Sequence, residues 1–97
     1  MPTKVEMEGK IGEILGRIMP AAVVERIEAR AMVDSVGENS LSIKVIVRER
    51  PPEQEVARLF EVVDEFRTWL ASRDDERFPY FRLLSRAEER EIQEVDR

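Results

Sequence analysis

The first hydrophobic pattern along the chain is helical. Five apolar residues recur at intervals of three and four positions, with charged residues between them: Met7, Ile11, Ile14, Leu15 and Ile18. This spacing places them on one face of a helix, so we predict a helix over residues 4–19 that ends at Pro20. Three glycines within it each weaken the helix by up to about 1 kcal/mol relative to alanine.

Strict alternation replaces the helical period between residues 24 and 48. Apolar residues occupy every second position on both sides of a polar segment: Ile27, Ala29, Ala31 and Val33, then Leu41, Ile43, Val45 and Val47. This pattern predicts two strands that each bury one face and are joined as a β-hairpin. A helix over residues 20–32 stays open as the alternative, because that segment contains good helix formers and Pro20 suits the first helical position.

The register of the hairpin is constrained by the requirement that directly paired residues lie on the same face. A three-residue loop over residues 37–39 meets this requirement and pairs Val33 with Ile43. The same register sets Glu28 opposite Arg48, which is a favourable ion pair across two strands. We therefore expect the hairpin to adopt this register.

The second half of the chain begins with the strongest periodic signal. After two prolines, residues 53–72 carry one apolar stripe at helical spacing: Val56, Leu59, Phe60, Val63, Phe66, Trp69 and Leu70. We predict a short third strand over residues 80–84. A last helix follows over residues 86–95, because Ser85 and Glu88 have the spacing of a capping box. One continuous helix over residues 79–95 is the alternative.

Together these elements predict an α+β fold in a single small domain over residues 1–97, in the order α-β-β-α-β-α. The β-hairpin and the short third strand form a small sheet, and the helices pack on one of its faces. The order resembles that of small KH-like and BON-like modules in outline. No Gly-x-x-Gly loop of KH type accompanies it.

Composition removes several classes of function. The chain has no cysteine and no histidine, so a thiol nucleophile, a cysteine-rich zinc site and the commonest general base are all missing. The net charge is −5, and the excess acid lies in the second half, interleaved with arginines. Phosphate neutralisation supplies most non-specific affinity for nucleic acids, so an acidic domain is a poor candidate for such binding.

The hydropathy of the chain also bears on its location. No apolar run approaches the about 20 residues that a membrane-spanning helix needs. The first residues contain no apolar core of a signal peptide. We therefore expect a cytoplasmic protein with no membrane association.

Three adjacent acids, Asp74, Asp75 and Glu76, are the sharpest candidate for a metal site. Calcium takes six to eight oxygen ligands, commonly from a loop of alternating acids with a glycine at its turn. Here the acids are adjacent and no glycine follows, while Arg73 and Arg77 flank them as competing cations. We therefore interpret the segment as a solvated connector, and we expect no metal site, no catalytic residue and no cofactor.

The remaining candidate is the second face of the predicted sheet. Five residues on the outward face of the predicted hairpin form the candidate interface: Arg30, Met32, Lys44, Ile46 and Arg48. A two-layer domain leaves one side of its sheet bare, and apolar residues there indicate that a partner covers them. We predict a non-enzymatic interaction, regulatory or adaptor module, homodimeric through this open face or bound to another protein. The alternative is a KH-like nucleic-acid-binding accessory domain, which the acidic balance disfavours.

Overall fold

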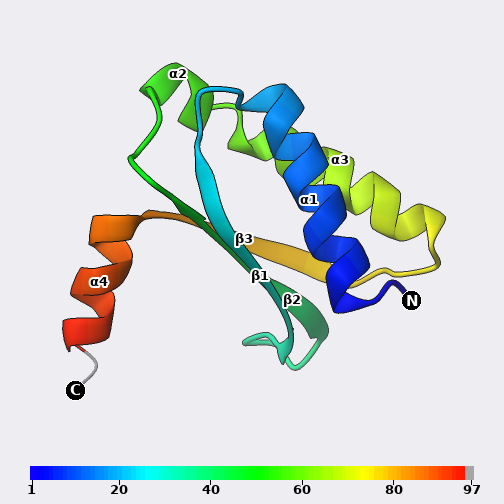
Figure 1. Cartoon of the computed structure of the whole chain (residues 1–97). Helices are drawn as coiled ribbons and strands as arrows, with labels where there is room; N and C mark the ends of the chain where they lie inside the picture. Colours follow the sequence, from blue (N-terminus) through cyan, green and yellow to red (C-terminus); the bar gives the residue numbers. More distant parts are fainter. Residues whose placement is uncertain (96–97) are drawn as a thin grey trace.

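A computed structural model describes residues 1–95 of the chain (Figure 1). Its elements are α1 (Lys4–Ile18), β1 (Val24–Val33), β2 (Asn39–Val47), α2 (Glu53–Val56), α3 (Leu59–Ser72), β3 (Phe78–Ser85) and α4 (Arg86–Val95). The predicted α+β fold and the order α-β-β-α-β-α are confirmed, with α2 and α3 in the place of one longer helix. Both alternative helices are excluded, because β1 and β3 occupy their positions. In the described part of the chain, no helix has the length and apolar character needed to cross a membrane.

The sheet has three strands in the order β1-β2-β3. Strand β1 pairs with β2 in the antiparallel sense, and β3 pairs with β2 in the parallel sense. Parallel neighbours need a crossover connection, which α2 and α3 supply. Strand β2 is therefore central and is hydrogen-bonded on both sides, while β1 and β3 form the two edges.

The register of the hairpin differs from the predicted one. Val33 pairs with Asn39 instead of Ile43, and Glu28 pairs with Lys44 instead of Arg48. The second strand is thus displaced by an even number of residues. Because side chains alternate with a period of two, an even displacement leaves every side chain on its predicted face.

The turn of the hairpin explains this displacement. Asp34 accepts hydrogen bonds on its side chain from the backbone N–H groups of Val36, at 3.1 Å, and Glu38, at 2.9 Å. Gly37 takes the left-handed conformation, with φ of 84°, which glycine adopts without steric cost. The turn therefore extends from Asp34 to Glu38 and is longer than the predicted loop.

The core lies between the sheet and the layer formed by α1 and α3. The helices contribute Met7, Ile11, Ile14, Leu15, Ile18, Val62, Phe66 and Leu70, and the sheet contributes Ala29, Leu41, Ile43, Val45 and Val47. Phe66 is fully buried at the centre, with ring centroids 5.7 Å from Trp69 and 5.9 Å from Phe81. Phe60, which was predicted to share the apolar stripe, is 64% exposed.

Helix α4 lies on the opposite side of the sheet from α1 and α3 (Figure 1). Its start follows the predicted capping box: Glu88 N–H donates to Ser85 Oγ, and Ser85 N–H donates to a Glu88 carboxylate oxygen, both at 3.1 Å. Only α1 and α3 therefore match the predicted packing of helices on one face. The position of α4 decides how much of the other face remains open.

We expect Phe66→Ala to lower the free energy of unfolding by about 3–5 kcal/mol, because it removes a buried ring and leaves a cavity. Phe60→Ala is the matched control, since it removes the same side chain from an exposed position on the same helix, and a change within about 0.5 kcal/mol is expected. Urea unfolding followed by Trp69 fluorescence measures both. Equal losses for the two variants would contradict the placement of α3.

Candidate functional site

The candidate site is the face of the sheet that is turned away from α1 and α3, here called the outer face. Its side chains are Arg26, Glu28, Arg30 and Met32 of β1, Ser40, Ser42, Lys44 and Ile46 of β2, and Phe78, Tyr80, Arg82 and Leu84 of β3. This assignment follows from the pairing of the strands. The neighbouring residues Phe81 and Leu83 of β3 pack against the core instead.

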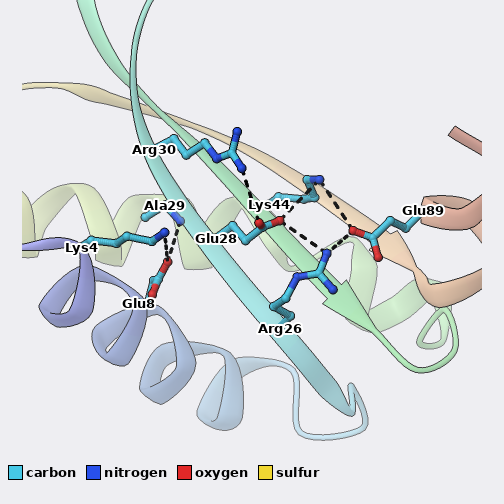
Figure 2. Close-up of polar contacts among 8 residues, drawn as sticks. All are labelled: Lys4, Glu8, Arg26, Glu28, Ala29, Arg30, Lys44 and Glu89. Atoms are coloured by element: carbon cyan, nitrogen blue, oxygen red, sulfur yellow. Dashed lines mark hydrogen bonds and ion pairs between the residues drawn. The ribbon is translucent and has the colours of Figure 1, made fainter. Parts of the chain in front are cut away.

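Glu28 is the centre of a charged network at one end of this face (Figure 2). One of its carboxylate oxygens lies 3.5 Å from Arg26 Nη2 and 3.5 Å from Lys44 Nζ, and the other lies 3.8 Å from Arg30 Nη2. Burial acts to raise the pKa of Glu28, but the charges of Lys44, Arg26 and Arg30 outweigh it and lower that pKa. Glu28 is therefore ionised and held by cations.

Glu89 joins helix α4 to this network (Figure 2). Its carboxylate accepts a hydrogen bond from Arg26 and lies 3.7 Å from Lys44 Nζ. The capping box fixes the first turn of α4, and Glu89 lies in that turn. Its side chain is 13% exposed, so these ion pairs are less screened than ordinary surface pairs. The network thus holds α4 against the sheet.

The position of α4 corrects the prediction that Ile46 is bare. Ile46 is 2% exposed, although it lies on the outer face between Arg26 and Leu84. Helix α4 contacts β2 and β3, and its first turn closes this end of the face, where Glu89 pairs with Arg26 and Lys44. Ile46 is therefore buried within the single chain and is not available to a partner.

The rest of the outer face, from the Glu28 network to the hairpin end of the sheet, is open. Five residues form what we call the open patch: Arg30, Met32, Phe78, Tyr80 and Arg82. Met32, Phe78 and Tyr80 are 36%, 40% and 44% exposed, and both arginines are exposed. Aromatic, methionine and arginine side chains from the two outer strands are thus exposed on one face of the sheet.

The aromatic side chains of the open patch are held in place by neighbours. The rings of Phe78 and Tyr80 lie 4.8 Å apart at their centroids. The Tyr80 hydroxyl donates to Asp34 at 3.3 Å, and the Arg67 guanidinium lies 4.9 Å from the centre of the Phe78 ring. These contacts order both rings, so little further side-chain entropy is lost when a partner covers them.

The structure divides the five predicted interface residues. Arg30 and Met32 belong to the open patch, whereas Lys44 lies in the network and Ile46 lies under α4. Arg48 follows the end of β2, and its Nε lies 3.7 Å from a carboxylate oxygen of Glu25.

Sequence reasoning missed the contribution of β3 to the open patch. Phe78, Tyr80 and Arg82 alternate with Pro79 and Phe81, which face the other way. The same period of two that identified the hairpin could have found them.

The three adjacent acids are not uniformly solvated, which corrects the interpretation of this segment as a solvated connector. Asp75 is 1% exposed and accepts hydrogen bonds from the guanidinium of Arg77 at 2.7 Å and 2.9 Å. Asp74 takes a left-handed conformation, with φ of 58°, and Glu76 is exposed. Among the described residues, no group of three or more acidic side chains is arranged to hold a metal ion.

No protein-family model matches the chain, and neither a curated protein nor a solved structure is significantly similar to it.

We expect Ile46→Ala to lower the free energy of unfolding by about 2–5 kcal/mol, because Ile46 is buried beneath α4. Met32→Ala on the same face is the control, and its half-exposed side chain should give a much smaller loss. Urea unfolding at low protein concentration measures both. Hydrogen exchange should also become faster in α4 of the Ile46 variant, and unchanged exchange there would contradict the covering role of α4.

The ion pair of Asp75 with Arg77 should make stability depend on pH. The hydrogen bonds from Arg77 lower the pKa of Asp75, although burial opposes them. The folded pKa thus lies below the unfolded value of about 4. The pair therefore stabilises the fold fully above about pH 4, and this contribution is lost as the pH falls through the folded pKa.

Arg77→Gln tests this pair, because it leaves a buried carboxylate without its cation and should cost about 3–5 kcal/mol at pH 7. The difference in free energy of unfolding between the variant and the unsubstituted chain should be smaller at pH 3. At that pH Asp75 of the variant is protonated and no longer needs a cation. Arg73→Gln is the control, since Arg73 pairs with Glu6 at 3.3 Å on the surface. A deficit that is equal at both pH values would contradict the assignment.

Proposed function

We propose that the chain is a non-enzymatic protein–protein interaction module, of the regulatory or adaptor kind, that binds its partner through the open patch. The observation that supports this most is the exposure of Met32 of β1 and of Phe78 and Tyr80 of β3 on the same face of the sheet. Aromatic residues, methionine and arginine are enriched in protein interfaces. Strands hold these side chains in fixed positions, which lowers the entropy cost of binding.

The state of the carboxylates supports a non-enzymatic role. Glu28 and Asp75 are held by cations, and the pKa of each is lowered, by the charges around Glu28 and by the hydrogen bonds from Arg77 to Asp75. A general acid or base works best when its pKa lies near the operating pH. The pKa values of these two carboxylates are shifted away from the operating pH. Both groups form ion pairs within the fold, which is a structural role.

A single-stranded nucleic acid is the second candidate partner. Arg30 and Arg82 flank the exposed ring of Tyr80, and an aromatic ring beside cationic side chains can stack a base and contact its phosphate. Two observations weigh against this candidate. The chain has a net charge of −5, and its Gly-x-x-Gly spacing, Gly9 to Gly12, lies within α1 and not in a loop.

Tyr80→Ala tests the open patch. We expect the variant to lose at least about tenfold in affinity for a protein partner captured by the unsubstituted chain, because an exposed, ordered tyrosine is a typical hot spot. Phe60→Ala is the control, since it removes an exposed aromatic side chain from α3, and it should bind as the unsubstituted chain does. Biosensor titration of the captured partner measures both variants.

If the captured protein partner binds the Tyr80→Ala variant as tightly as the unsubstituted chain, the proposal is contradicted. A titration with polyuridine then separates the two candidate partners. Salt-dependent binding of polyuridine that is lost in Arg82→Glu would favour the nucleic-acid candidate instead.

A further inference from the structure

We propose that a second copy of the chain pairs with the free edge of β1, antiparallel and about a two-fold axis at Met32, so that two three-stranded sheets join into one. This proposal goes beyond the proposed function, because it adds a second contact surface: the backbone edge of β1, which adjoins the open patch at Arg30 and Met32. It also replaces the face-to-face contact predicted from the sequence, because Ile46 is buried within each chain.

Alternate residues of β1 turn their backbone groups away from β2, along one side of the strand. Asp34 N–H donates to Glu38 O at 2.9 Å, so this residue pair is hydrogen-bonded. Hydrogen-bonded and non-hydrogen-bonded pairs alternate in an antiparallel ladder. Met32 and Arg30 therefore bond to β2, whereas the backbone groups of Ala31 and Val33 point away from it, towards the edge of the sheet.

Glu8 of α1 limits where this edge is open (Figure 2). Its carboxylate accepts a hydrogen bond at 2.9 Å from Ala29 N–H, and it lies 3.9 Å from Lys4 Nζ. The bond from Ala29 confirms that odd-numbered residues of β1 point away from β2. The edge donor of Ala29 is thus occupied, and a new strand can pair only with the segment from Ala31 onward, where Val33 is 63% exposed.

Only one position of the two-fold axis lets the free backbone groups of this segment pair with those of a second copy. An axis at Met32 sets Ala31 opposite Val33 of the second copy, and each such pair exchanges both backbone hydrogen bonds. An axis at Ala31 would require the N–H of Ala29, which Glu8 already holds. An axis at Val33 would place the apolar side chain of Met32 against Asp34 of the second copy.

The chosen register is also complementary in charge. It sets Arg30 of each copy opposite Asp34 of the other, with the two Met32 side chains in contact between them. The Arg30 side chain is 74% exposed, and Glu28 lies 3.8 Å from it. Hydrogen bonds from the backbone of Glu38 and of Val36 lower the pKa of Asp34, so its carboxylate is ionised at neutral pH. A cation, an apolar residue and an anion in this order are self-complementary when read in opposite directions, as a two-fold interface requires.

Single cysteines test the register, because the chain contains none of its own. In Met32→Cys the two thiols would lie across a non-hydrogen-bonded pair, with Cα atoms about 4.5 Å apart, within reach of a disulfide. In Arg30→Cys, a more exposed position on the same strand, the two thiols would be offset by about 13 Å along the strands and could not bond.

Under mild oxidation at matched concentrations, we expect non-reducing electrophoresis to show covalent dimer for Met32→Cys, at least about tenfold more than for Arg30→Cys. Ser42→Cys, on the same face but on β2, should remain monomeric. Equal cross-linking at residues 30 and 32 would overturn the register. Cross-linking at residue 42 but not at residue 32 would indicate a face-to-face contact and would overturn the proposal.

Sedimentation of the cysteine-free chain provides the second measurement. We expect its mass to rise with concentration towards that of a dimer, and Arg30→Glu to weaken the dimer at least about tenfold, because glutamate would face Asp34. A monomer at every concentration up to about 1 mM would overturn self-pairing. If Tyr80→Ala still lost a protein partner in that case, the proposed function would stand and only this inference would fail.

Discussion

Strand β2 needs hydrogen-bonding partners along both of its edges and burial of the apolar side chains on both of its faces. The rest of the fold follows from this constraint. Its inner side chains, from Leu41 to Val47, are fully buried, and Ile46 on its outer face is 2% exposed. The parallel pairing with β3 requires a crossover, and that crossover contains α3, which covers the inner face with Phe66. On the outer face only the end around Ile46 is closed, beside the first turn of α4, which begins where β3 ends.

The faces of the sheet could be predicted from the sequence because side chains alternate strictly along a strand. The register could not be predicted, because the same alternation permits any displacement by an even number of residues. The displacement was decided by local turn chemistry: Asp34 bonds to two backbone N–H groups and Gly37 takes a left-handed conformation. Glu28 finds a cationic neighbour in either register, so charge alone could not decide between them.

Two features depend on tertiary structure that no local pattern contains: the packing of α4 at the candidate site and the burial of Asp75 in the connector after α3. Helix α4 has few apolar residues, and ion pairs of Arg86, Glu88 and Glu89 hold it to Glu25, Arg50, Arg26 and Lys44, which come from distant parts of the chain. Asp75 is buried because the chain folds back after α3, and the adjacent Arg77 supplies its counter-charge. The sequence showed that Arg77 is a cation close to Asp75. It could not show that the pair is buried, because that burial depends on how the connector packs against the rest of the fold.

The hydrogen bond from Ala29 to Glu8 has a consequence for solubility. A sheet with two unprotected edges can add strands without limit, because each added chain offers a fresh edge to the next. Here a carboxylate from α1 occupies the middle of β1, and β3 carries Pro79, which has no backbone N–H to offer. Each edge of the sheet therefore lacks one free backbone donor, which opposes growth into a fibril through repeated pairing of β1 with β3.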